Sequence, residues 1–252
     1  MEVHAHTHTA RKKWTHYFWE FLMLFLAVFC GFLAENQREH YIEHQREKHF
    51  MKTLLQDLKN DTTSFSNTIR ILQNSIDRFD SLKSFIKNPV TSQAILNSYK
   101  AATLVWRFGS FNYSDRTIEQ LKSAGNFRLI RNSSVSDSLI QYDKYLRNLY
   151  MDIEEVILRQ NLRLGDIQNE LFDYDIYYYL RNKNWQELNK ISTESITYPL
   201  KLISIRDEKL LQYYNSLGLC RDWWRRFVYH SGILKNSAVR LIALIKKEYH
   251  LK

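Results

Sequence analysis

Residues that turn or break a chain are scarce in this sequence. Its 252 residues include only 6 glycines and 2 prolines. A β-sandwich or β-barrel needs many tight turns, which these two residue types supply. The scarcity therefore argues against such folds and leaves room for long helices. The length suits one domain with an appendage, and we expect an all-α protein.

Cysteine is equally scarce, and the familiar catalytic motifs are missing. The 2 cysteines, Cys30 and Cys220, lie far apart, Cys30 within an apolar run, so we expect no internal disulfide. The sequence has no Cys-x-x-Cys pair, no glycine-rich phosphate loop and no nucleophile elbow. We therefore expect no enzymatic activity, no cofactor and no small-molecule substrate.

One long apolar run extends from Tyr17 to Ala34, and its 14 residues from Phe21 onward carry no charge. As a helix, those residues rise only about 21 Å, which is less than the roughly 30 Å of a hydrocarbon core. Aromatic rings favour the headgroup region, so we expect Trp14, Tyr17 and Trp19 to lie at the membrane interface and complete the span. The run has no polar face, which favours a transmembrane helix over 17–34 rather than the core helix of a soluble protein.

The flanks of this run favour a retained anchor. The cluster Arg11-Lys12-Lys13 precedes it, as in a signal peptide, but the run ends Gly31-Phe32-Leu33-Ala34-Glu35. Cleavage after Ala34 would place a phenylalanine where a small residue is needed. The basic residues are densest before the run, so we expect the N-terminus to be cytoplasmic and the rest of the chain to lie on the other side.

The sequence divides into an N-terminal tail, an anchor, a stalk and a main domain. Residues 1–16 form a short polar tail, 17–34 the signal-anchor helix, 35–50 a charged stalk and 51–252 the main domain. No helix breaker separates Ala34 from Met51, so we expect the transmembrane helix to continue directly into the domain.

Three segments of the domain have apolar residues in four-three spacing, which is typical of helices in a bundle or coiled coil. The first ends before Asn88-Pro89, and Ser134 and Ser204 are the expected N-terminal caps of the other two. Short connectors between them predict an up-and-down bundle. The seams are Met51, Leu55, Leu58, Thr62, Phe65, Ile69, Leu72, Ile76 and Phe79; Leu139, Tyr142, Leu146, Leu149, Ile153 and Val156; and Leu217, Cys220, Trp224, Phe227, Ser231, Leu234, Ala238, Leu241 and Ile245.

A second copy of the chain could share these seams. The strongest periodicity lies in the first segment, where Phe65, Ile69, Leu72 and Ile76 form the candidate oligomer seam. Coiled-coil partners pack through such narrow apolar stripes. We therefore expect the protein to form homo-oligomers or to bind other membrane proteins.

Three stretches resemble a family of uncharacterised bacterial single-pass membrane proteins. They are Phe18-Trp19-Glu20-Phe21-Leu22-Met23 with Gly31-Phe32-Leu33-Ala34-Glu35, the segment Thr117–Ile130, which reads TIEQLKSAGNFRLI, and the segment Leu244–Leu251, which reads LIKKEYHL. The resemblance implies an anchor in the bacterial inner membrane and a helical domain, which the predicted orientation would place in the periplasm. It implies no activity and no functional residues.

Histidine provides weak metal candidates. His40-Tyr41-Ile42-Glu43-His44 matches an inverted zinc-protease pattern, in which His40 and His44 lie one helical turn apart beside Glu43. No third ligand is evident, so a solvated helix is the preferred interpretation. His4, His6 and His8 alternate in the N-terminal tail and could bind a transition metal, although such tails are usually incidental.

The C-terminal segment is basic and aromatic. Residues 221–252 contain 8 lysines and arginines against 2 acidic residues, which gives 8 − 2 = +6. Trp223, Arg225 and Arg226 could contact anionic lipid headgroups, and we expect no nucleic acid as a partner. The preferred structural interpretation places one tryptophan in the seam and packs the other under arginine side chains.

These observations favour a membrane-anchored helical scaffold or protein-interaction module. The alternatives are the sensory arm of a membrane signalling assembly and, less favoured, a metal-dependent hydrolase that uses His40, Glu43 and His44.

Overall fold

The computed structural model describes residues 14–105, 112–123 and 125–251, and His4, His6, His8 and the basic cluster 11–13 lie outside these ranges. The chain divides into two compact units, 1–50 and 51–252, which we describe separately. Within the described ranges the chain is helical and forms no strand, apart from an isolated bridge between Phe172 and Leu202. The all-α prediction is confirmed.

The first unit contains the N-terminal part of helix α1 (Trp14–Ile86), which also supplies residues to the second unit. Its apolar side chains are exposed all around the helix; they include Phe18, Phe21, Met23, Leu24, Phe25, Val28, Phe29 and Phe32. The most apolar window of α1 has a mean hydropathy of 2.0, and none of it is buried. By length and composition this helix could cross a membrane.

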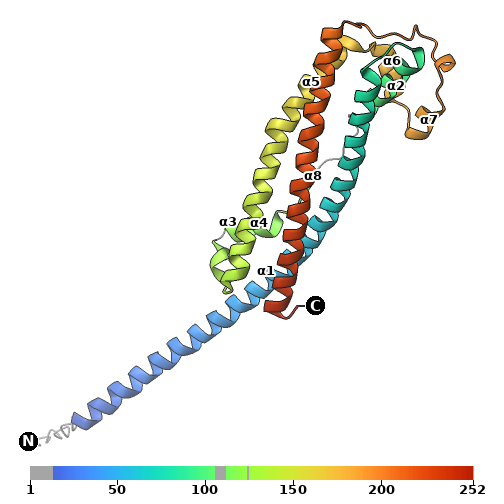
Figure 1. The fold of residues 1–252 in the computed structure, drawn as a ribbon. Coiled ribbons are helices and arrows are strands. Elements are labelled where there is room, and N and C mark those ends of the chain that lie inside the picture. The colour runs from blue at the N-terminus through green and yellow to red at the C-terminus, as the bar shows by residue number, and fades with distance from the viewer. Residues whose placement is uncertain (1–13, 106–111, 124, 252) are drawn as a thin grey trace, which may run out of the picture. The chain divides into compact units, whose positions relative to one another are not determined.

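Three long helical segments build the second unit: the 51–86 part of α1, the pair α4 (Ser133–Asp152) and α5 (Leu158–Leu171), and α8 (Asp207–Tyr249) (Figure 1). α8 is antiparallel to α4 and α5, because Asn132 Nδ2 donates to Glu248 Oε2 at 2.8 Å near one end and Tyr213 donates to Gln168 at 2.9 Å near the other.

The order of these segments departs from strict up-and-down alternation. Tyr142 donates to Asp61, and Arg221 of α8 donates to Asp80. Since α8 is antiparallel to α4 and α5, the 51–86 part of α1 must run parallel to α4 and α5. The predicted alternation is therefore wrong for this pair, because the chain between them folds back through α2 (Ser92–Val105) and α3 (Arg116–Ser123).

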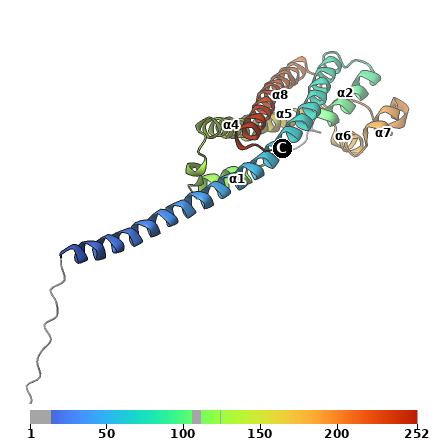
Figure 2. The same cartoon turned by 90° about the horizontal axis from the view of Figure 1, so that it is seen from below.

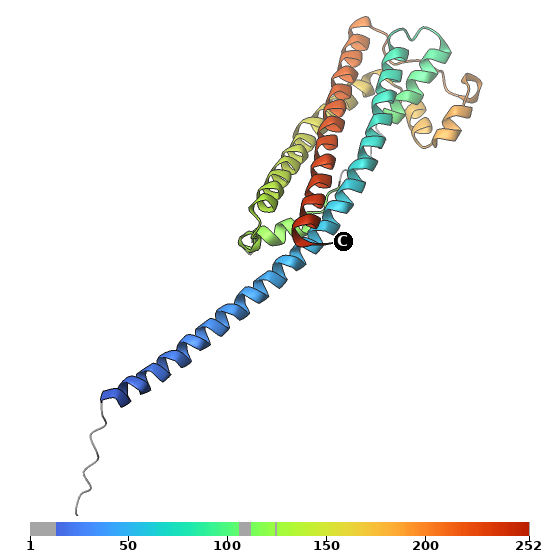
Figure 3. The same cartoon turned by 60° about the horizontal axis from the view of Figure 1, so that its bottom comes forward.

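Short helices lie at the two ends of the bundle. Helix α6 (Tyr174–Arg181) lies beside α2 and is followed by α7 (Trp185–Lys190), whereas α3 and the 3-10 turn η1 (Asn126–Leu129) precede α4 (Figures 2 and 3). A second 3-10 turn, η3 (Thr193–Ser195), leads toward α8. Gly125, two residues after the end of α3, has φ 63°, a left-handed conformation that glycine adopts without strain.

The predicted seams form the core of the bundle. Every residue of the third seam, from Leu217 to Ile245, is buried. In the first seam only Thr62 and Ile69 keep partial exposure. Phe65, Leu72 and Ile76 are therefore covered by the chain's own helices and are not a free surface for a second copy.

The second seam shifts where a π-helix, η2 (Ile153–Ile157), joins α4 to α5. A π-turn adds a residue to the helical repeat, so Ile157 is buried instead of the predicted Val156. Two predicted caps are also wrong. Asn132, not Ser134, accepts from the backbone N–H of Val135, and the last helix begins at Asp207, three residues after Ser204.

Candidate functional site

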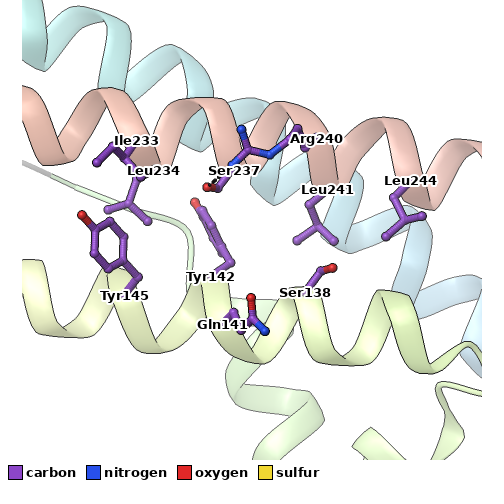
Figure 4. Close-up of a pocket in the computed structure, with 10 residues that line it drawn as sticks. All are labelled: Ser138, Gln141, Tyr142, Tyr145, Ile233, Leu234, Ser237, Arg240, Leu241 and Leu244. Atoms are coloured by element: carbon purple, nitrogen blue, oxygen red, sulfur yellow. Dashed lines mark hydrogen bonds between the residues drawn. The ribbon is translucent and has the colours of Figure 1, made fainter.

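A groove with a volume of about 430 Å³ lies between α4 and α8. Figure 4 shows side chains of both helices pointing into it. Its apolar lining comes from α8, and polar groups from both helices complete it. The apolar residues are Ile233, Leu234, Leu241 and Leu244, the tyrosines are Tyr142 and Tyr145, and the polar residues are Ser138, Gln141, Ser237 and Arg240.

Small side chains create this groove. Ser138 of α4 and Ser237 of α8 occupy positions where larger residues would fill the space between the helices. Beyond it the helices are joined directly, because Tyr145 bonds to Nδ1 of His230 and Asn132 bonds to Glu248. The groove is therefore bounded at both ends by contacts between α4 and α8.

Arg240 gives the groove its charge. Its Nη2 donates to Oγ of Ser237 at 2.9 Å, and the side chain makes no ion pair with a carboxylate of the described chain. By contrast, Arg221 and Arg225 of the same helix both pair with Asp80, at 2.7 and 3.5 Å. Arg240 is exposed, so its remaining guanidinium donors are available at the rim of the groove.

Tyr142 links the groove to a buried polar cluster on α1. Its hydroxyl donates to Oδ2 of Asp61 at 2.7 Å, and the backbone N–H of Ser114 donates to Oδ1 of Asp61 at 2.7 Å. One turn earlier, Asp57 accepts from the backbone and hydroxyl of Thr117 at 3.1 and 2.5 Å. Arg116 Nη2 adds a third donor to Asp57 at 3.1 Å.

The two aspartates hold the start of α3 and the middle of α4 against α1. Both carboxylates and the side chains of Thr117 and Tyr142 are buried. Burial raises the pKa of Asp61 above its ordinary value of 3.8, while the hydrogen bonds from Tyr142 and Ser114 oppose this rise. Burial, together with the nearby Asp61 carboxylate, raises the pKa of Tyr142, so its hydroxyl remains a donor.

The predicted metal candidates lie apart from this groove in the sequence, on the first unit. His44 Nδ1 lies 3.4 Å from Oε2 of Glu47, one turn further along α1. Within the described parts of the chain, no three His, Cys, Asp or Glu side chains are arranged to hold a metal ion, and this includes His40, Glu43 and His44.

The predicted headgroup residues are engaged within α8 and with α1. Arg226 lies over the ring of Trp223 at 5.4 Å, Trp224 is buried in the seam, and Arg225 pairs with Asp80. This matches the structural interpretation of the segment, and contact with headgroups stays a prediction. Trp14, Tyr17 and Trp19 are exposed on α1, and their place at a membrane interface also stays a prediction.

The described residues therefore define an all-α protein with one apolar helix that could span a membrane and a helical bundle that carries a groove. Comparisons with protein-family models, with curated protein sequences and with solved structures gave no match to this chain. The resemblance to single-pass membrane proteins accordingly stays a prediction.

Replacement of Tyr142 by phenylalanine tests the polar cluster. The change removes a donor from the buried carboxylate of Asp61, so we expect the free energy of unfolding to fall by about 1–3 kcal/mol at neutral pH. The pKa of Asp61 is raised in the folded protein, and the lost bond raises it further. A protonated Asp61 needs this donor less, so the loss should shrink as the pH falls below the raised pKa.

Urea denaturation at several pH values measures both effects. Tyr198→Phe is the matched control, because Tyr198 is exposed and its hydroxyl makes no hydrogen bond with the described residues. A Tyr142→Phe loss that is equal at all pH values, or no larger than that of the control, would contradict the assigned role of Asp61.

Proposed function

We propose that this chain is a membrane-anchored helical interaction protein. Residues 17–34 cross the bilayer, and the bundle of 51–252 presents its surface to partners. The observation that carries the proposal is the exposure of apolar side chains on every face of the first unit. In water such a surface would associate or aggregate, whereas in a bilayer the hydrocarbon chains cover it.

The proposed location is the inner membrane of a bacterium. The density of basic residues before the apolar run supports a cytoplasmic N-terminus and a periplasmic bundle. The bacterial origin rests on the sequence resemblance alone.

Partners are proposed to be further copies of this chain or other membrane proteins. The burial of Phe65, Leu72 and Ile76 in the chain's own core removes the seam as the contact surface. Association through the apolar segment is the version of this proposal that we favour, because Ala27, Gly31 and Ala34 are small and small residues let membrane helices approach closely.

Charged substitutions in the apolar segment test the anchor. Leu24 and Val28 are 70% and 75% exposed, and two arginines at these positions should oppose insertion by about 5–7 kcal/mol in total. We expect the Leu24→Arg, Val28→Arg protein to be released from membranes by alkaline extraction. Val90→Arg, at a 77% exposed position of the bundle, is the matched control and should stay membrane-bound. Retention of the double variant at the wild-type level would overturn the anchor.

Reporter fusions test the orientation. A reporter enzyme that works only in the cytoplasm should be active when it is fused before Met1 and inactive when it is fused after Lys252, because the basic cluster keeps the N-terminus inside. Activity at the C-terminal fusion would place the bundle in the cytoplasm and reverse the proposed topology.

Cysteine cross-linking tests self-association in native membranes. Cys30 is exposed, whereas Cys220 is buried and burial raises the pKa of its thiol to about 12, so Cys220 is unreactive and need not be removed. In a Cys30→Ser background, single cysteines are placed in turn at each position from 24 to 33. We expect disulfide-linked dimers upon oxidation with a helical period, strongest on the face of Ala27 and Gly31.

Three outcomes of this scan are informative. A helical period centred on another face would move the interface, and dimers of equal yield at every position would indicate random collision. The absence of dimers at all positions, with the protein folded and membrane-bound, would contradict self-association through this segment.

A further inference from the structure

We propose that one end of the bundle docks on anionic lipid headgroups. This end, which we call the basic end, is the one at which α1 enters the bundle at Met51. Its contact residues are Lys52 of α1, Arg128 of η1, and Lys246 and Lys247 in the last turn of α8. The proposal rests on the proposed anchor, because a chain held in a bilayer keeps this end close to headgroups.

Contacts within the bundle bring these four side chains to one end. Asp57, about one and a half turns after Lys52, accepts from the backbone of Thr117 in α3, and α3 leads through η1 to α4. Asn132, which precedes α4, donates to Glu248 at the end of α8. Figure 1 shows α3 and the C-terminal end of α8 at the end where α1 enters the bundle.

The basic end has an excess of positive charge. Lys52, Arg128 and Lys247 are exposed and Lys246 is half-buried, and none of the four pairs with an acidic side chain of the described residues. The segments 115–137 and 240–251, which form most of this end, contain 7 basic and 4 acidic residues, a net charge of 7 − 4 = +3. The segment 170–209 at the opposite end contains 6 basic and 7 acidic residues, a net charge of 6 − 7 = −1.

The dipole of α8 explains only part of this excess. Lysines in the last turn of a helix are favoured by its dipole, which would account for Lys246 and Lys247 without any partner. The dipole does not account for Lys52 in the middle of α1 or for Arg128 in η1. The shared feature of the four side chains is therefore their position at one end of the bundle.

The basic end differs from the surface of the predicted headgroup residues. Arg225 pairs with Asp80, which lies 29 residue steps after Met51, or about 44 Å along α1. Trp223 and Arg226 belong to the same part of α8. They lie toward the opposite end of the bundle, so the basic end is better placed to meet a membrane that the chain reaches through α1.

The length of α1 before the bundle allows this contact. From Ala34 to Met51 the helix makes 17 residue steps and rises about 25 Å, whereas attraction is screened over about 8 Å at physiological salt. Transmembrane helices tilt by up to about 40°. At that tilt Met51 lies about 19 Å above the hydrocarbon core, and one edge of an end about 20 Å wide lies about 13 Å lower. That edge is then within the headgroup layer.

The tether makes a few basic side chains sufficient. Each basic side chain close to an anionic surface contributes about fivefold to binding, so four of them would hold a free protein on a membrane only weakly. The anchor turns this binding into a contact within one molecule, at a high effective concentration of membrane. The bundle therefore docks through charges that would not recruit it from solution.

Headgroup quenching in nanodiscs tests the proposal with the full chain. In a Cys30→Ser background, a fluorophore is attached through Ser134→Cys in the basic end or Asn182→Cys in the opposite end, both at exposed positions. The discs contain phosphatidylcholine with a nitroxide on its headgroup, with or without phosphatidylglycerol. We expect quenching at 134 that requires phosphatidylglycerol and weakens at high salt, and little quenching at 182.

Charge-neutral variants identify the docking residues. The triple change Arg128→Gln, Lys246→Gln, Lys247→Gln should lower the ratio of docked to undocked bundle about a hundredfold, because each charge contributes about fivefold. Quenching at 134 should then fall to its level in pure phosphatidylcholine. The matched control is Lys190→Gln, Lys201→Gln, Arg206→Gln, which removes three exposed charges from the opposite end and should leave quenching unchanged. Circular dichroism shows whether both variants are folded.

The outcomes separate the docking surface from the anchor. Protein that does not co-elute with the discs would overturn the anchor, and this proposal with it. Co-elution with quenching at 134 that ignores phosphatidylglycerol, or that the triple variant retains, would overturn the docking surface alone. Quenching at 134 that occurs in native membranes but not in phosphatidylglycerol discs would assign the basic end to a protein partner and also overturn the proposal.

Discussion

The bundle depends on two carboxylates buried one turn apart on α1. Removal of Asp57 and Asp61 from water is costly, and the cost is offset only where hydrogen-bond donors are fixed around them. These donors come from two other parts of the chain: Ser114 and Thr117 at the start of α3, and Tyr142 in α4. The carboxylates therefore set where both segments lie along α1.

The same constraint shapes the groove. Tyr142 cannot turn away from α1 without leaving Asp61 short of a donor in a buried place, so its ring stays beside the apolar lining. The contacts of Tyr145 with His230 and of Asn132 with Glu248 then fix α8 against α4 at two levels. Between these levels Ser138 and Ser237 are too small to close the space. The groove therefore lies between two contacts that join α4 to α8.

The sequence predicted those parts of the fold that are marked by a local repeat of apolar residues. Four-three spacing marks the buried face of a helix, so the residues from Leu217 to Ile245 were identified correctly. The same spacing does not say which surface covers that face. Phe65, Leu72 and Ile76 fit an oligomer seam or an internal core equally well, and the chain's own helices cover them.

Features that depend on contacts between residues far apart in the sequence have no local pattern that predicts them. The parallel arrangement of α1 and α4 depends on how 87–132 folds back, and no period in that segment reports its path. Ser138 and Ser237 line one groove only because α4 and α8 pack side by side. Asp57 and Asp61 did provide a signal for the buried polar cluster. Two acidic residues beside the apolar positions of a seam need hydrogen-bond donors when the helix is packed.

The two units use apolar side chains in opposite ways, and this contrast supports the proposed anchor. In the bundle the large apolar residues of the seams are buried against other helices. In the first unit phenylalanine, leucine and valine are exposed on every face of α1, and the described chain provides nothing to cover the most apolar window. One chain cannot satisfy both patterns in water, because the second leaves a large apolar surface hydrated. A bilayer removes the conflict, since it provides for 17–34 the apolar surroundings that the seams of the bundle provide for each other.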